Sequence, residues 1–127
     1  MAILNFHKRF AEKVEAGTKQ QTIRGFRKYP IQVGDKLYLY TGLRSKDARK
    51  LREGECLRNR VIKISRRSIT IQERLSRLSY MIKIRFSDLD TLNRFAREDG
   101  FKDWVEMKAW WLKIHGLPWT GNLIEWI

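Results

Sequence analysis

Short apolar runs alternate with polar residues along the chain, and their spacing predicts strands and helices of modest length. Residues 3–6 are typical of a short buried strand, and the apolar positions of residues 9–16 recur at helical spacing. Gly17 predicts the end of that helix, because glycine readily adopts the left-handed backbone conformation that stops helices. Residues 18–24 contain two threonines and an isoleucine and are expected to be extended.

The clearest alternation lies in residues 36–42. Leu37 and Leu39 fall on one face of the expected strand, and Tyr38 and Tyr40 fall on the other. This pattern is typical of a strand whose two faces meet different surroundings.

Further strands are expected in the second half of the chain. Residues 43–54 are strongly charged and are expected to form a basic loop, or one helical turn, closed by Gly54. Strands are expected near residues 56–65 and 68–71, joined by a polar turn. Residues 80–86 alternate strictly between apolar and other side chains and predict another strand.

Two helices are expected next, each opened by a pair of side chains spaced as in a capping box. Ser87 with Asp90 marks the start of the first helix, which runs to Gly100. Asp103 with Glu106 marks the start of the second helix.

The second helix is expected over residues 104–114 with a stop at Gly116, and residues 119–127 are expected to form a closing strand. Several short strands at close spacing, with helices near both ends, predict an α+β fold: a small mixed β-barrel with flanking helices. With 127 residues, 43% of them hydrophobic, we expect a single domain over residues 1–127 that buries a core of its own.

Positive charge is concentrated in the middle of the chain. The formal net charge is +13, and residues 44–77 hold twelve Lys and Arg against four Asp and Glu, whereas residues 98–127 hold three against five. Such asymmetry attracts polyanions through counterion release and favours single-stranded RNA as a partner over a merely solubilising surface. The candidate nucleic-acid-binding residues are Arg44, Lys46, Arg49, Lys50, Arg52, Arg66 and Arg67.

The same composition argues against several other classes of protein. The single cysteine, Cys56, allows no disulfide framework and is expected to be an inert core thiol. His7 and His115 are too few and too distant in the chain to suggest zinc, so we expect no metal and no organic cofactor. The first residues resemble neither a signal peptide nor a membrane span, and we expect a cytoplasmic monomer without a membrane partner.

Only the junction at residues 17–24 argues for chemistry. Lys19, Thr22 and Arg24 fall within six residues there, where a helix should stop and a strand begin. A hydroxyl is a weak nucleophile, and Lys19 could activate it if burial or cationic neighbours such as Arg24 and Arg27 lowered the pKa of the amine. The alternative is that Thr22 is an ordinary strand residue and Lys19 a solvated charge. The residue chemistry alone favours this alternative.

Two longer motifs extend this segment over nearly the whole chain. The first reads Phe6…Arg9-Phe10…Gly17-x-Lys19-x-x-Thr22-Ile23-Arg24, followed by Gly34-Asp35-x-Leu37, and the second reads Asp99-Gly100-Phe101…Gly121-x-Leu123-Ile124-x-Trp126. Together they resemble the signature of the ASCH superfamily, small β-barrel proteins related to the PUA RNA-binding domain, including forms from bacteria and their phages.

This resemblance implies an activity and a set of residues. Some ASCH proteins are amidohydrolases that remove the acyl group from N4-acetylcytidine and related nucleosides, using a lysine, a threonine and a glutamate. The lysine and the threonine match Lys19 and Thr22. The carboxylate falls at Glu98 or Asp99, because alignment against Gly100 favours Asp99 whereas residue identity favours Glu98. The implied substrate is a cytosine nucleoside or modified RNA.

Two other functions remain open beside the amidohydrolase. One is a non-catalytic RNA-binding module, and the other is a ribonuclease, an activity that also occurs in the superfamily. The strong positive charge favours these alternatives, because a free nucleoside needs no such field. The Lys-x-x-Thr-x-Arg run favours the amidohydrolase.

A substrate cleft is expected between residues 19–27 and the helix end at residues 98–100. Candidate substrate-binding residues are Arg24, Phe26, Arg27, Tyr38 and Tyr40. The arginines are suited to clamping an anion, and the aromatic side chains are suited to stacking on bases. Trp104 and Trp111, at helical spacing, are more typical of a core than of a stacking platform.

Overall fold

The structure is a computed structural model that describes residues 1–74 and 81–127. Within these residues the chain forms seven strands, three α-helices and one short 3-10 helix. They are, in order, β1 (Ala2–Phe6), η1 (Lys8–Phe10), α1 (Ala11–Ala16), β2 (Gln21–Arg24), β3 (Lys36–Thr41), β4 (Arg49–Ile64), β5 (Ile69–Arg74), β6 (Met81–Phe86), α2 (Leu89–Glu98), α3 (Trp104–Ile114) and β7 (Trp119–Trp126).

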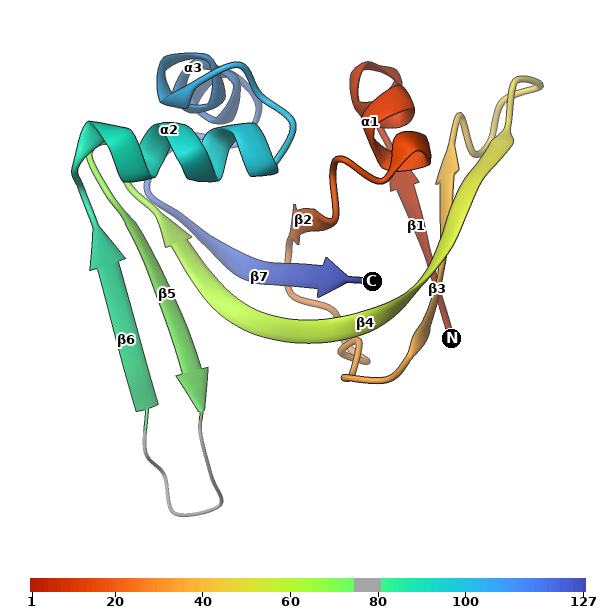
Figure 1. Cartoon of the computed structure of the whole chain (residues 1–127), viewed down its shortest axis with the longest axis horizontal. Coiled ribbons are helices and arrows are strands. Elements are labelled where there is room, and N and C mark those ends of the chain that lie inside the picture. Colours follow the sequence, from red (N-terminus) through yellow and green to blue (C-terminus); the bar gives the residue numbers. More distant parts are fainter. Residues whose placement is uncertain (75–80) are drawn as a thin grey trace.

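The long strand β4 organises the sheet. It has 16 residues and curves through the middle of the molecule (Figure 1). Its first part pairs with β3, its second part pairs with β7, and its end also pairs with β5, in each case antiparallel. The remaining strands attach at the margins: β1 lies parallel to β3, β6 pairs with β5, and β2 pairs with β7.

The α+β class is confirmed, but the sheet does not close into a barrel. In the described part of the chain, β1, β2 and β6 each pair with a single neighbour and form edges of the sheet. Strand β2 has only four residues, and all four pair with β7. A side chain crosses from β2 to β1, because Arg24 Nη2 donates to the carbonyl of Asn5 at 2.6 Å.

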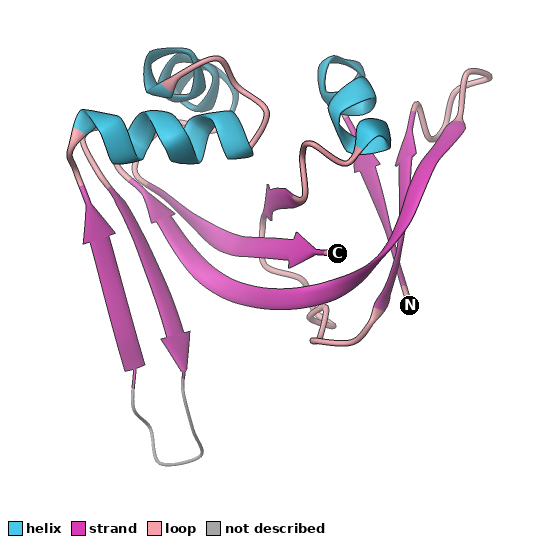
Figure 2. Ribbon diagram, viewed as in Figure 1, coloured by secondary structure: helices cyan, strands magenta, loops and turns pink. Residues whose placement is uncertain are grey.

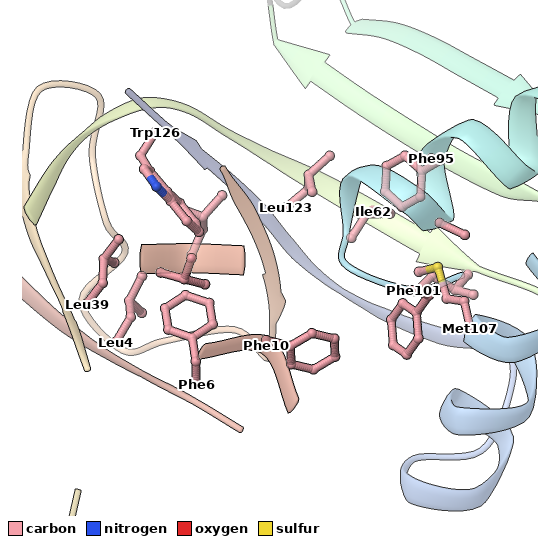
Figure 3. Packing of buried hydrophobic residues seen from close by; sticks show 14 of the residues in the cluster. Leu4, Phe6, Phe10, Leu39, Ile62, Phe95, Phe101, Met107, Leu123 and Trp126 are labelled. Atoms are coloured by element: carbon pink, nitrogen blue, oxygen red, sulfur yellow. The ribbon is translucent and has the colours of Figure 1, made fainter. Parts of the chain in front are cut away.

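The helices lie on one side of the curved sheet (Figure 2). The helix α2 packs over the end of the sheet formed by β5 and β6, where the ring centroids of Phe86 and Phe95 are 5.8 Å apart. The buried apolar side chains form one cluster. Figure 3 shows its two ends, one around Phe6, Leu4 and Leu39 near Trp126, and the other around Phe95, Phe101 and Met107.

Several local predictions are confirmed. Leu37 and Leu39 are fully buried and the tyrosines beside them on β3 are half-buried. The turns at Gly17, Gly100 and Gly116 have positive φ angles, as expected of helix stops. Cys56 and the tryptophans at 104 and 111 lie in the core.

The expectation for residues 43–54 is wrong in its second half. The strand β4 already begins at Arg49, and only the residues before it form a loop. The charges that suggested a loop are accommodated by ion pairs, because the Glu53 carboxylate lies 3.1 Å from the amine of Lys36 on β3 and 3.1 Å from that of Lys50 on β4 itself. Pairing with β3 therefore outweighs the low strand propensity of the charged residues.

One helix cap also differs from the prediction. The N-cap of α2 is Asp88 rather than Ser87, and its carboxylate accepts the backbone N–H of Thr91 at 2.9 Å. The N-cap of α3 is Asp103 as predicted, and its side chain accepts the N–H of Glu106 at 2.9 Å. Tyr80, expected to begin a strand, lies outside the described residues.

Candidate functional site

Lys19 is a buried lysine. The left-handed turn at Gly17 ends α1, and the chain then places Lys19 just before β2. The side chain is only 3% exposed, and its Nζ donates to the backbone carbonyl of Asp99 at 2.6 Å and to Asp99 Oδ1 at 3.2 Å. The alternative in which Lys19 is a solvated charge is therefore wrong.

Asp99 is the carboxylate that meets Lys19. It caps the C-terminal end of α2, and Gly100 with φ 98° turns the chain immediately after it. Asp99 Oδ1 also accepts a hydrogen bond from Gln21 Nε2 at 3.2 Å. Glu98 is exposed and lines a separate depression with Gln20, so the helix turns only Asp99 toward the lysine.

Thr22 and Arg24 lie on the same face of β2, two residues apart. Thr22 is buried, with 5% of its surface exposed. Its Oγ1 accepts a hydrogen bond from Arg24 Nε at 2.9 Å. Because the hydroxyl oxygen acts as the acceptor in this bond, its hydrogen stays free for donation to another group.

One pocket of about 180 Å³ is lined by Lys19, Thr22, Arg24 and Asp99. Aromatic rings supply much of its wall, from Phe6, Phe10, Phe101, Trp110 and Trp111. The Lys19 amine lies 4.9 Å from the centroid of the Phe10 ring, and the Arg24 guanidinium lies 4.9 Å from that of Phe6. Rings at this distance favour cations electrostatically while they exclude water. The expected cleft between the β2 segment and the end of α2 is present.

Burial changes the proton affinities in the pocket. Burial lowers the pKa of Lys19 from 10.5; the Asp99 carboxylate opposes this shift, and the positive charges of Arg24 and Lys13 add to it. Burial likewise raises the pKa of Asp99 from 3.8, against the attraction of Lys19. The pKa of Arg24 falls to about 10, owing to burial and then to the charge of Arg27. The neutral amine of Lys19 is therefore more accessible than that of an ordinary lysine.

The other predicted substrate-binding residues lie outside this pocket. Phe26 and Arg27 are exposed in the loop after β2, and neither lines it. Tyr38 and Tyr40 lie on β3 and do not line it either, and the Tyr38 ring has the Lys36 and Lys50 amines 5.4 and 5.3 Å from its centroid.

The predicted nucleic-acid-binding residues do not form one surface. Residues 44–52 surround the start of β4, whereas Arg66 and Arg67 lie in the turn after its end (Figure 1). At the first end, Arg49 forms an ion pair with Glu15 at 2.5 Å and Arg52 Nη1 donates to the Glu15 carbonyl at 3.1 Å. Part of the predicted cationic surface is therefore already engaged within the protein.

Sequence reasoning missed several residues of the pocket. Gln21 was not singled out, although its amide fixes the Asp99 carboxylate. His7 and Trp110 line the pocket as well, and the Trp111 indole nitrogen is buried without a hydrogen-bond partner in the described residues. Gln21 lies between Lys19 and Thr22 in the chain, but only the distant contact with Asp99 marks it.

The described residues contain no cluster of three or more His, Cys, Asp or Glu placed to bind a metal ion. None of their helices is both long and apolar enough to cross a membrane. Comparisons with protein-family models, with curated proteins and with solved structures found no match to this chain.

Proposed function

We propose that this protein is an ASCH-type amidohydrolase that removes the acyl group from an N4-acylated cytosine, in a nucleoside or in RNA. The observation that carries the proposal is the buried Lys19–Asp99 pair beside Thr22 in a single pocket. Lys19 and Thr22 are positions that the resemblance to ASCH amidohydrolases suggests, and Asp99 is one of the two carboxylates that it left open. The open sheet then corresponds to a PUA-like barrel left open between β1 and β2.

The buried ion pair favours an enzyme over a simple binding module. Two charges removed from water carry a desolvation penalty that their attraction often fails to offset, so such a pair is weak evidence of stability. Perturbed proton affinities in a pocket are instead typical of catalytic sites. Lys19 and Asp99 have this property, and the Thr22 hydroxyl lies in the same pocket.

In the first step, the neutral amine of Lys19 accepts the proton of Thr22 as Oγ1 attacks the acyl carbonyl carbon. The carbonyl electron pair moves to oxygen and forms a tetrahedral intermediate. When the intermediate collapses, the bond between the carbonyl carbon and N4 breaks, and the Lys19 ammonium returns its proton to N4. The products of this step are the cytosine amine and an acyl ester on Thr22.

In the second step, water attacks the ester and Lys19 accepts its proton. Collapse of this intermediate breaks the bond to Oγ1, and the proton on Lys19 restores the Thr22 hydroxyl. The carboxylic acid leaves. No metal is required in either step.

The neighbouring groups have positioning and electrostatic roles. The Asp99 carboxylate and carbonyl hold the Lys19 amine through two hydrogen bonds, and Gln21 holds the carboxylate. Arg24 remains a cation at neutral pH with its pKa near 10. Its charge beside Thr22 would stabilise negative charge that develops on oxygen during attack.

The pocket size bears on the substrate. Its volume of about 180 Å³ is below the roughly 300 Å³ at which drug-sized ligand sites begin. An acylated base would fill it, and the ribose would lie outside. The pocket therefore suits a base presented by a nucleoside or by a nucleotide chain.

The direct test is incubation of the purified protein with N4-acetylcytidine, with release of cytidine followed by chromatography. We expect turnover by the wild type and its loss in Thr22→Ala. Lys19→Arg is expected to be inactive, because a guanidinium cannot act as a base at neutral pH. Asp99→Asn is expected to lower turnover at least ~10²-fold.

Glu98→Gln is the matched control for Asp99→Asn, because it makes the same chemical change one residue away on an exposed side chain. It should retain near wild-type turnover. Normal activity in Thr22→Ala, or equal activity in Asp99→Asn and Glu98→Gln, would contradict this mechanism.

A further inference from the structure

A second cationic region lies on the face of the sheet opposite the helices. The apolar side chains of β5, Ile69 and Ile71, are buried, and Ile69 lies opposite Phe86, whose ring packs against Phe95 of α2. The alternate residues of β4, β5 and β6 therefore point to the other face. We call this the outer face, and it is formed by Lys63 on β4, Thr70 and Gln72 on β5, and Lys83 and Arg85 on β6.

The strand register brings these residues together although they are distant in sequence. Lys63 lies opposite Thr70, and Thr70 lies opposite Arg85, so the three form one row across the sheet. Gln72 lies opposite Lys83 in the next row on the same face. Two cations therefore flank one hydroxyl, with a third cation in the adjacent row.

This face is hollowed rather than flat. A shallow depression of about 580 Å³ is lined by the outer-face residues together with Ser65 and Ser68 of the turn between β4 and β5. Its described lining contains three cations, three hydroxyls and an amide, and none of these residues carries a carboxylate or an aromatic ring. The exposed turn residues Arg66 and Arg67 adjoin it in the chain.

Among the described residues, no ion pair engages the cations of the outer face. Ion pairs in the described residues engage Arg49 and Lys50 at the other end of β4, but none engages Lys63, Lys83 or Arg85. Like charges held close together repel one another, and a bound polyanion relieves this repulsion while it releases counterions.

We propose that the outer face binds the sugar–phosphate backbone of single-stranded RNA or DNA, without sequence preference. Lysine, arginine, serine, threonine and glutamine are the side-chain types that contact phosphate and sugar, and the depression is lined by these types alone. Because the described lining offers phosphate and sugar contacts and no ring for a base to stack on, we expect the affinity to come from the backbone.

This inference is independent of the proposed hydrolase. No residue in the described part of the chain lines both the outer-face depression and the pocket around Lys19. It also places the main phosphate contacts on the outer face and not at the start of β4, where Glu15 and Glu53 partly match the positive charges.

The test is the salt dependence of binding to fluorescent 12-nucleotide U and A oligomers, measured by fluorescence anisotropy. We expect both oligomers to bind with the same salt slope. The double variant Lys83→Gln/Arg85→Gln should flatten the slope of log affinity against log salt by about 1.4, at about 0.7 for each lost phosphate contact on a single strand. If affinities at 1 M salt are equal, this corresponds to about 25-fold weaker binding at 0.1 M.

The matched control is Lys102→Gln/Lys113→Gln, which removes the same charge from exposed positions before and within α3. It should change the slope far less. Both double variants alter exposed side chains, and unchanged thermal unfolding will verify their folds.

Equal effects of the two double variants would show that net charge alone governs binding and would overturn the proposed site. Absence of binding to either oligomer at low salt would overturn it too, as would binding to vesicles of anionic lipid without binding to the oligomers. Amide chemical-shift changes on U12 addition that centre on β5 and β6 would support it, and changes that centre on residues 44–52 would contradict it.

Discussion

The amine of Lys19 is buried and contacts a small set of protein groups in place of water. A carbonyl and a carboxylate oxygen of Asp99 accept its hydrogen bonds, and the Phe10 ring lies on one side. Each partner favours the charged amine, yet burial outweighs them and lowers its pKa. The proton affinity of Lys19 therefore depends on a balance that single substitutions can shift in either direction.

We predict that Lys19 titrates below the ordinary lysine value of 10.5. Asp99→Asn should lower its pKa further, because the carboxylate that raises it is removed, whereas Arg24→Ala should raise it by removing a neighbouring cation. NMR titration of side-chain-labelled lysines measures these shifts directly. A Lys19 resonance that titrates with the bulk of the lysines would contradict the buried position.

The same shift has a consequence for stability. Between the folded pKa of Lys19 and 10.5, the unfolded chain binds a proton that the folded protein has released. The contribution of Lys19 to the free energy of unfolding therefore rises with pH through that window. The raised pKa of Asp99 acts oppositely: its contribution is fully present below 3.8 and is lost as the pH rises through the folded value.

At the scale of single elements, the helices follow local signals closely. The helix α3 begins and ends where its cap and its glycine indicate, because capping involves neighbouring residues only. For α2, two adjacent residues, Ser87 and Asp88, are both good caps. Asp88 takes the position, and its carboxylate accepts both the N–H and the hydroxyl of Thr91.

We predict that Asp103→Ala and Asp88→Ala each lower the free energy of unfolding by about 1 kcal/mol. Ser87→Ala is the control beside Asp88 and should change it far less, because Ser87 is outside the helix and makes no capping bond among the described residues. Urea denaturation of the three variants measures the difference. A larger loss of unfolding free energy in Ser87→Ala than in Asp88→Ala would show that Ser87, and not Asp88, is the N-cap.

The strands were less predictable than the helices because their pairing is not local. The alternation of residues 36–42 predicted β3 and its buried leucines, since that pattern lies within the strand itself. The first six residues of β4 have no such pattern, and only their register with β3 makes them a strand. The same reason applies to the candidate site. Lys19 and Thr22 lie in one short segment and were proposed because that segment resembles the ASCH motif. Only the orientation of a helix end eighty residues away shows that Asp99, rather than Glu98, contacts Lys19.

For the whole molecule, Arg24 connects two sheet edges that do not pair. Its guanidinium donates to Thr22 on β2 and to the Asn5 carbonyl on β1, and it lies over the Phe6 ring. The Arg24 side chain, which also lines the pocket, therefore links two strands that share no backbone hydrogen bonds.

We predict that Arg24→Lys lowers the free energy of unfolding by about 1–2 kcal/mol, although it keeps the charge, because one ammonium cannot span both acceptors in the same geometry. It should also speed hydrogen exchange of the β2 amides. Arg27→Lys makes the same change at an exposed neighbour and should leave both quantities unchanged. Equal stability of the two variants would show that Arg24 does not hold the edges together.

The pairing of β2 with β7 also determines when β2 can join the sheet during translation. Thr22 lies opposite Ile124, so the strand that carries the hydroxyl has no sheet neighbour until the last described strand is synthesised. At roughly 5–20 residues per second, the ribosome needs about 5–20 s to travel from residue 24 to residue 125. During that interval Thr22 lacks the strand that pairs with β2. The pocket can therefore form only after β7 has been synthesised, when the strands that precede it in the chain have already been made.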